Sequence, residues 1–271
     1  MRCERIYLNE SDVRVYIDTY VCDIPKRRDA ILVIPGGAYR EVCASREGEP
    51  VALAFVALGY NAFVLNYRVG REGDVFPKQL IDAGSAMLYI REHAEEFNIN
   101  ANRVFAVGFS AGGHLLASIS TMYRFDEARE AFGDKADRIR PTGAILAYPV
   151  TSLLEKTHEN SFKNLLGRPS GEYTDEERER YSVECNLGAH IPPLFIWHTA
   201  EDKAVPPEGS MRLGYELAKR GLPYKLAMYP YGPHGISLGT AQSATAPEHI
   251  QPLASGWVAE ADGWMKTLPD Y

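Results

Sequence analysis

The sequence lacks three features that would assign it to a specialised class of protein. No run of about eighteen apolar residues is present, which argues against a transmembrane helix. The 4 cysteines are widely spaced and form no CxxC pair, so neither a disulfide framework nor a structural zinc site is expected. A basic excess is missing as well, because 36 acidic side chains outnumber 29 basic ones and the formal net charge is -7. The balance argues against a nucleic-acid partner and an anionic membrane surface.

The composition that remains is that of an ordinary globular protein. Hydrophobic residues make up 45% of the chain and charged residues 24%. The first residues alternate between charged and apolar types and lack the apolar core of a signal peptide, so the expected location is the cytoplasm. A length of 271 residues predicts a single domain over residues 1–271. The oligomeric state stays open, with a homo-oligomer among the options.

Short apolar segments alternate with segments of helical periodicity along most of the chain. Strands are expected at residues 6–8, 13–20, 30–35, 62–67, 103–108, 143–148, 193–198 and 224–228, and helices at 50–59, 80–97, 111–122, 208–220 and 247–266. This order predicts an α/β fold with a mostly parallel central sheet and helices on both faces. Residues 151–190 are polar and show no strand pattern, which indicates a small helical insertion over the site that restricts its substrates.

The segment Gly108-Phe109-Ser110-Ala111-Gly112 is a G-x-S-x-G motif between an expected strand and an expected helix. In that context the motif is typical of a nucleophile elbow, in which a strained turn exposes the serine hydroxyl. The helix that follows directs its N-terminal dipole at the site, where it favours developing negative charge. The motif predicts the α/β-hydrolase fold with Ser110 as nucleophile.

The strand at 30–35 runs into Gly36, Gly37 and Ala38. In α/β-hydrolases, a loop in this place donates backbone N–H groups to the oxyanion of the reaction, and glycine allows the backbone to approach the substrate. The predicted donors are the N–H groups of Gly37, of one neighbour (Gly36 or Ala38) and of Ala111.

A serine hydroxyl needs a base within hydrogen-bond reach, and in this fold an acid and then a histidine follow the serine along the chain. His234 lies in a glycine-rich loop directly after the strand at 224–228, and Asp202 lies in the loop after the strand at 193–198. They are the predicted base and acid, and Glu201 is the neighbouring alternative for the acid. The chain order excludes His93 as the base, because it precedes Ser110. Of the other histidines, His114 is expected to pack and His198 to line the site, and surface or structural roles are expected for His158, His190 and His249.

Four stretches, IPGGAYR, GFSAGGHLLAS, WHTAEDKAVP and YPYGPHGIS, together resemble the bacterial acetyl xylan esterase and acetyl-feruloyl esterase group in the hormone-sensitive-lipase-like branch of α/β-hydrolases. The resemblance covers residues from about 30 to about 238. It departs from many lipases of that branch, which carry HGGG where this chain has Pro35-Gly36-Gly37-Ala38. The departure favours the carbohydrate-esterase group over the lipases.

The resemblance implies removal of acetyl groups from acetylated xylo-oligosaccharides through an acetyl-enzyme on Ser110, with no cofactor and no metal. Tyr39, Tyr67 and Trp197 are predicted substrate contacts for a sugar. Three other functions remain open: a feruloyl or general short-chain carboxylesterase, a serine peptidase of the same fold, and a non-catalytic binding protein. A feruloyl group would need a deep acyl pocket lined by aromatic residues.

Overall fold

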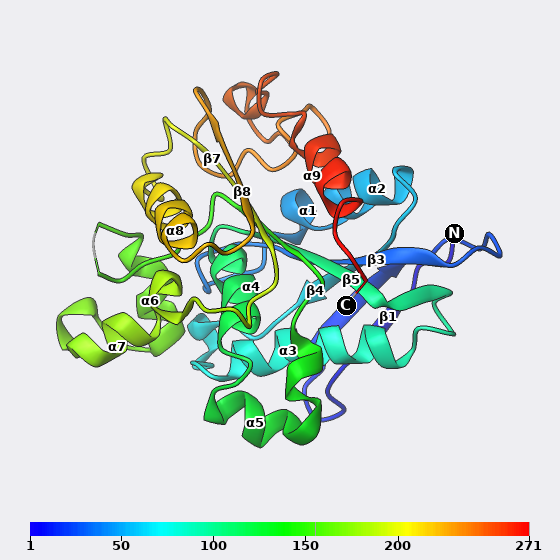
Figure 1. Cartoon of the computed structure of the whole chain (residues 1–271), viewed down its shortest axis with the longest axis horizontal. Helices are drawn as coiled ribbons and strands as arrows, with labels where there is room; N and C mark the ends of the chain where they lie inside the picture. The colour runs from blue at the N-terminus through cyan, green and yellow to red at the C-terminus, as the bar shows by residue number, and fades with distance from the viewer. Residues whose placement is uncertain (155, 271) are drawn as a thin grey trace.

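A central sheet organises the protein, whose computed structural model describes residues 1–154 and 156–270. Within those ranges eight strands form one sheet in the order β1-β2-β4-β3-β5-β6-β7-β8 (Figure 1). The strands are β1 (Arg5–Tyr7), β2 (Tyr16–Tyr20), β3 (Arg28–Ile34), β4 (Asn61–Asn66), β5 (Ile99–Phe109), β6 (Ala144–Ala147), β7 (Leu194–Thr199) and β8 (Tyr224–Tyr229). The β1–β2 and β2–β4 pairs are antiparallel and the others parallel. The predicted α/β-hydrolase architecture is therefore confirmed.

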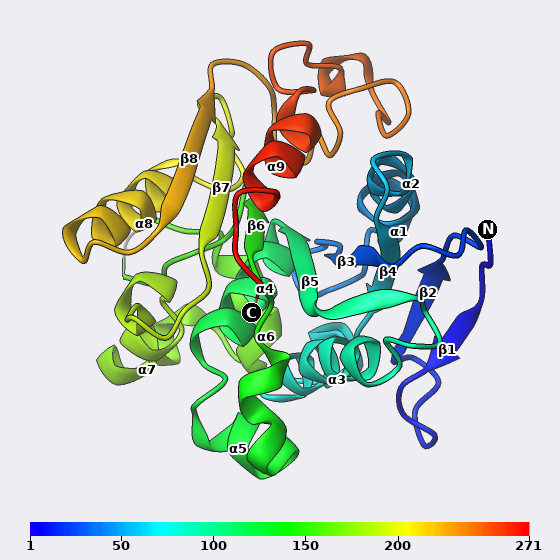
Figure 2. The ribbon, with the colours of Figure 1, turned by 45° about the vertical axis from the view of Figure 1, so that its right-hand side comes forward.

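Helices cover both faces of the sheet (Figure 2). The α-helices are α1 (Ala44–Glu47), α2 (Glu49–Ala57), α3 (Lys78–Glu92), α4 (Ala111–Thr121), α5 (Asp126–Phe132), α6 (Glu159–Leu166), α7 (Asp175–Arg180), α8 (Glu208–Lys219) and α9 (Trp257–Met265). The 3-10 turns are η1 (Gly70–Glu72), η2 (Gly133–Ile139), η3 (Ser170–Glu172), η4 (Val183–Asn186) and η5 (Pro247–His249). Helices α2 and α9 share one apolar core with the sheet, and α3, α4 and α8 share the other.

The central strands contain continuous apolar runs because each face of the sheet is covered. Leu32 of β3 belongs to the core under α3 and α4, whereas its neighbour Val33 belongs to the core under α2 and α9. Both side chains are fully buried. Parallel strands covered on both faces have this continuous apolar pattern, which is why their positions could be predicted from the sequence.

One predicted helix was wrong in its starting residue, and one further helix was not predicted. The last helix was expected from residue 247, but α9 begins only at Trp257, and the residues before it form a 3-10 turn and irregular backbone. Pro252 interrupts this stretch, since proline removes an amide donor and disfavours a helical residue before it. Helix α5 was not predicted, and only Ala128 of its residues is buried, so it lacks a strong apolar face.

The residues of interest follow the C-terminal ends of the parallel strands β3, β5, β6, β7 and β8. Because these strands run in the same direction, their ends lie along one edge of the sheet, where α/β folds place their ligands. Residues 151–190, which we call the insertion, connect β6 to β7 and contain α6, η3, α7 and η4. Across the described residues, no helix combines the length and apolar character needed to cross a membrane.

Candidate active site

Ser110 occupies a strained turn between β5 and α4. Its backbone has φ 52 and ψ -118, a conformation that L-residues rarely adopt and that surrounding structure must enforce. Gly112 allows the turn to pack against the end of β3, because a Cβ there would lie 2.4 Å from the carbonyl oxygen of Pro35. The local geometry is that of the nucleophile elbow expected from the motif.

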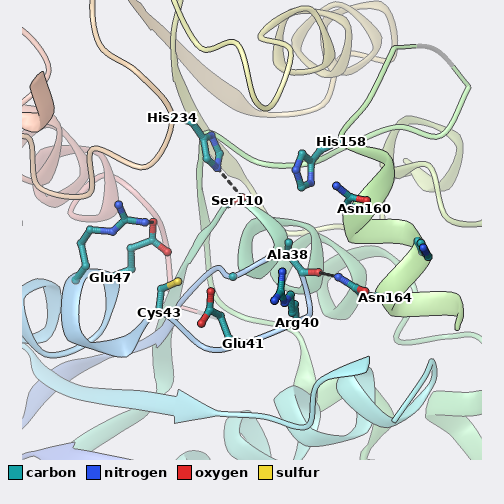
Figure 3. Close-up of a pocket in the computed structure, with 13 residues that line it drawn as sticks. Ala38, Arg40, Glu41, Cys43, Glu47, Ser110, His158, Asn160, Asn164 and His234 are labelled. Carbon is teal, nitrogen blue, oxygen red and sulfur yellow. Dashed lines mark hydrogen bonds and ion pairs between the residues drawn. The ribbon is translucent and has the colours of Figure 1, made fainter. Parts of the chain in front are cut away.

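The structure brings together the three residues predicted as a triad. His234 Nε2 lies 2.9 Å from Ser110 Oγ, as the dashed line in Figure 3 shows, and His234 Nδ1 lies 2.6 Å from Asp202 Oδ2. The second carboxylate oxygen of Asp202 accepts the N–H groups of Ala204 and Val205, each at 2.9 Å. With Nδ1–H donating to Asp202, the free electron pair of Nε2 faces the serine hydroxyl.

A second imidazole also contacts the Asp202 carboxylate. His198 is completely buried at the end of β7, and its Nε2 lies 3.1 Å from Asp202 Oδ2 while its Nδ1 lies 2.8 Å from Ser210 Oγ. Burial alone would raise the pKa of Asp202, but the hydrogen bonds from His198 and His234 outweigh it and hold the pKa of this carboxyl below its usual range. Asp202 therefore carries a negative charge beside His234 across the neutral pH range.

Glu201, the alternative acid, takes a different place. Its carboxylate accepts the Gly232 N–H at 3.2 Å, whereas both hydrogen bonds to His234 and His198 are made by Asp202. Asp202, rather than Glu201, is the carboxylate that the fold aligns with His234 and Ser110.

The loop after β3 places backbone amides near Ser110. One of its contacts corrects the prediction that Gly36 is a candidate oxyanion donor. The N–H of Gly36 donates to the buried carboxylate of Glu47 at 2.8 Å, so this amide is already engaged and is removed from the oxyanion candidates. Gly37 and Ala38 line the pocket together with Ser110. Ala111 opens helix α4, where the first amides have no partner inside the helix. The remaining candidate donors are Gly37, Ala38 and Ala111.

Glu47 connects this loop to the loop that carries His234. Its second oxygen accepts the hydroxyl of Tyr148 at 2.8 Å, and Tyr148 Oη accepts the N–H of Ser237 at 3.1 Å. The ring of Tyr148 packs edge-on against His234, with ring centroids 5.1 Å apart. Burial and then the Glu47 carboxylate raise the pKa of Tyr148 well above its usual value, so its hydroxyl keeps its proton.

His114 links the insertion to the loop that follows β3. Its Nε2 donates to the carbonyl oxygen of Tyr181 at 2.9 Å, and its Nδ1 accepts the hydroxyl of Tyr39 at 2.8 Å. Burial lowers the pKa of His114 to about 4, against the smaller effect of the Tyr181 carbonyl. The imidazole is therefore neutral at pH 7, in agreement with a packing role predicted from the sequence.

A pocket of about 570 Å³ opens in front of Ser110 (Figure 3). Its walls come from the loop after β3, from α1, from the insertion and from the His234 loop. The lining residues are Gly37, Ala38, Arg40, Glu41, Cys43, Arg46, Glu47, Ser110, His158, Asn160, Lys163, Asn164 and His234. Among these described residues none is an aliphatic residue larger than alanine, and none carries an aromatic ring other than imidazole. The pocket is built mainly of polar and charged side chains.

His158 was predicted as a surface or structural residue, and that prediction missed its position at the pocket. The side chain points into the pocket from the insertion, across Ser110 from His234 (Figure 3). Burial and the nearby His234 lower the pKa of His158, which keeps its ring neutral at pH 7. Its position in a loop that follows β6 at the ligand-binding edge of the sheet was the available signal.

The three aromatic residues predicted as sugar contacts do not line the pocket. Tyr39 and Tyr67 are each 1% exposed, and their hydroxyls bond to His114 and to the Pro35 carbonyl oxygen. Trp197 is completely buried and stacks on Trp257. These predictions were wrong because the large rings pack into the core, Tyr39 and Tyr67 on one face of the sheet and Trp197 on the other.

Two other pocket or supporting residues escaped sequence reasoning. Glu47 and Asn164 belong to no motif, and Tyr148 and Ala38, to which they bond, lie more than a hundred positions away in the chain. His198, which was expected to line the site, is instead completely buried against Asp202, which follows it by four residues. Within residues 1–154 and 156–270, no group of three or more histidine, cysteine, aspartate or glutamate side chains is arranged to hold a metal ion.

Comparison with known proteins identifies the family. A family model described as BD-FAE matches residues 17–217, about three quarters of the chain. The chain belongs to the BD-FAE family. This agrees with the resemblance to the acetyl xylan and acetyl-feruloyl esterase group seen in the sequence motifs.

Individual relatives are consistent with this placement. The chain is 37% identical to the endo-1,4-β-xylanase B of Butyrivibrio fibrisolvens over 78% of its own length and 33% of that protein. It is 32% identical to the acetylxylan esterase of Xylanibacter ruminicola over 92% of its length and 48% of that protein. The chain thus spans a third to about half of these curated relatives.

A solved structure is similar over nearly the whole chain. The acetyl ester-xyloside bifunctional hydrolase of Caldicellulosiruptor lactoaceticus shares 33% sequence identity, with a TM-score of 0.83 over 98% of this chain and 96% of that one. The similarity supports the α/β-hydrolase architecture along the described chain.

Proposed function

We propose that this BD-FAE family member is a serine ester hydrolase that removes acetyl groups from acetylated xylo-oligosaccharides. The proposal treats residues 1–271 as one catalytic domain, with residues 151–190 as an insertion in it. The observation that carries the chemistry is the hydrogen-bonded series from Ser110 through His234 to Asp202 on a strained elbow. The base lies within hydrogen-bond distance of both the nucleophile and the orienting acid, as covalent catalysis by serine requires.

In the proposed reaction, Ser110 Oγ attacks the ester carbonyl carbon and His234 Nε2 takes the hydroxyl proton. Asp202 stabilises the imidazolium that forms, and the N–H groups of Gly37, Ala38 and Ala111 donate to the oxyanion. The carbon–oxygen bond to the sugar then breaks, and His234 returns the proton to the sugar oxygen. Water, activated by His234 in the same way, attacks the acetyl-enzyme and releases acetate.

The lining of the pocket favours a small acyl group on a polyhydroxylated alcohol. Side chains that donate and accept hydrogen bonds, among them His158 and Glu41, match sugar hydroxyl groups. A feruloyl ring would find no aromatic wall among the described lining residues. Two relatives support the same substrate class, since one is named an acetylxylan esterase and another an acetyl ester-xyloside hydrolase.

The test is acetate release from acetylated xylo-oligosaccharides, measured beside p-nitrophenyl acetate, methyl ferulate and the variant Ser110→Ala. We expect rapid release from the oligosaccharides, little turnover of methyl ferulate, and loss of both acetyl-ester activities in the variant. Hydrolysis of p-nitrophenyl acetate alone would refute the sugar assignment and leave a general short-chain carboxylesterase. Absence of activity on every ester would refute the proposal as a whole.

A further inference from the structure

The insertion makes a direct hydrogen bond to the loop that carries two of the candidate oxyanion donors. The side-chain amide of Asn164, on helix α6, donates through Nδ2 to the carbonyl oxygen of Ala38 at 2.8 Å (Figure 3). The direction is set by chemistry, because only the NH₂ group of the amide can donate to a carbonyl. A residue of the insertion therefore holds the backbone of a residue that lines the pocket beside Ser110.

Ala38 needs such a restraint because its backbone is in an unfavourable conformation. Ala38 has φ 56 and the next residue, Tyr39, has φ 54, and neither is a glycine. Non-glycine residues occupy this left-handed region only where the surrounding contacts enforce it. The carbonyl oxygen of Tyr39 is also held, since it accepts the N–H of Gly70 at 2.7 Å. Both consecutive carbonyl groups of the strained segment are therefore fixed from outside the loop.

Helix α6 and the turn η1 are packed together around this segment. A Cβ at Gly70 would lie only 1.8 Å from the carbonyl oxygen of Asn164, so the close approach requires glycine. The helix is also anchored on its other side, where the N–H of Phe76 donates to the carbonyl oxygen of Leu165 at 2.8 Å. Phe162 is completely buried against His114, with ring centroids 5.0 Å apart. Asn164 thus projects from a fixed helix.

We propose that Asn164 is a positioning residue that holds Ala38 in its left-handed conformation and so directs the loop amides to the oxyanion. The insertion then completes the oxyanion hole in addition to forming a wall of the pocket. This inference rests on the proposed serine-hydrolase function. It predicts that loss of the bond lowers the rate of the chemical step more than it weakens substrate binding, because the oxyanion exists only after attack.

The test compares Asn164→Asp with Asn160→Asp. Both asparagines are on α6 and line the same pocket, so each variant adds a carboxylate of unchanged size to the same wall. Only the substitution at position 164 replaces the NH₂ donor that contacts Ala38. Asn164→Ala and Asn160→Ala form a second pair that adds no charge. Thermal unfolding of all four variants verifies that they are folded.

We expect kcat on p-nitrophenyl acetate to fall roughly 10- to 100-fold in Asn164→Asp, with KM changed less than about threefold, because small displacements of catalytic groups have effects of this size. Inhibition by n-butylboronic acid, which forms a tetrahedral anion on the serine, should weaken in parallel. Asn160→Asp should keep most of its kcat and its boronate affinity.

Two results would overturn the inference and are distinguishable. An active wild-type enzyme whose position-164 variants are no more impaired than their position-160 partners would leave the proposed function standing and refute the role of Asn164. A wild-type protein without activity on any ester and without boronate affinity would refute the proposed function, and the inference with it.

Discussion

The acid–base groups and the oxyanion loop lie on two sides of Ser110. The hydrogen bonds that hold them differ in the number of chain positions that they span. On the acid–base side, His198 contacts Asp202 across 4 positions and Ser210 across 12, and Asp202 contacts His234 across 32. On the oxyanion side, Tyr148 reaches Glu47 across 101 positions and Asn164 reaches Ala38 across 126. The acid and base are placed almost by a local unit of β7, β8 and their loops, whereas the oxyanion side also depends on hydrogen bonds between distant segments of the chain.

The two sides also differ in the kind of interaction they supply. The acid–base side uses the buried carboxylate of Asp202 and the imidazole of His234, whose effect depends on charge. The oxyanion side uses backbone dipoles, whose effect depends on orientation and therefore on every contact that restrains the loop. Substitutions on the first side should abolish a chemical role, and those on the second should misplace groups that remain present.

The largest effect is expected on the acid–base side. Asp202→Asn should lower kcat on p-nitrophenyl acetate by about 10⁴-fold, as the corresponding change does in serine proteases, because the amide neither stabilises the imidazolium nor fixes its tautomer. Steady-state kinetics measure the loss, and Glu201→Gln is the matched control that should stay near the wild-type rate. A loss below tenfold in Asp202→Asn would show that another carboxylate serves His234.

A smaller but still large effect is expected from the buried carboxylate on the oxyanion side. Glu47→Ala removes the acceptor of the Gly36 N–H and of the Tyr148 hydroxyl, and should lower kcat by about 10²- to 10³-fold, the range seen when an oxyanion donor is lost. Glu47→Gln retains one carbonyl oxygen as acceptor and should lose less. Equal rates for wild type and Glu47→Ala would show that the hydrogen bonds accepted by Glu47 do not support the oxyanion hole.

Acid should weaken the fold through His114, which joins the insertion to Tyr39. Burial lowers its pKa to about 4 in the folded protein, whereas the ordinary value is 6.5. Between these values the unfolded chain binds the extra proton, so the free energy of unfolding falls as the pH decreases from 6.5 to 4, by about 3 kcal/mol from this group. Urea unfolding over this pH range measures the slope.

The variant His114→Gln isolates that contribution, because glutamine does not titrate. Its free energy of unfolding should be lower at pH 7 but should change less between pH 6.5 and pH 4 than that of the wild type. An unchanged slope in the variant would contradict a neutral, buried His114.

The smallest effect is expected at α7, and it distinguishes the role of this helix from that of α6. Thr174 caps α7 in a capping box with Glu177, and no residue of that helix is buried or lines the pocket. Thr174→Ala should lower the free energy of unfolding by about 1 kcal/mol and leave kcat unchanged. A fall in kcat comparable to that of Asn164→Asp would mean that the whole insertion, rather than α6, supports the oxyanion loop.

The sequence by itself determined the parts that depend on short-range patterns. Buried parallel strands read as continuous apolar runs, and the elbow around Ser110 needs small residues at fixed spacing. Asp202 and His234 could be chosen because both follow a strand that ends at the same edge of the sheet. Patterning failed where no period existed, as at the irregular stretch before α9 and at the weakly amphipathic helix α5.

Only the tertiary structure decided what surrounds the triad. Burial of Tyr39, Tyr67 and Trp197 results from covering both faces of the sheet, a property of layers that no local window of sequence reveals. Tyr148 and Ala38, which bond to Glu47 and Asn164, come from distant segments. The Gly36 amide was lost as an oxyanion candidate because the buried carboxylate of Glu47, a residue of no motif, accepts it. A hydrogen bond between residues a hundred positions apart leaves no spacing to recognise, because the fold alone brings its donor and acceptor together.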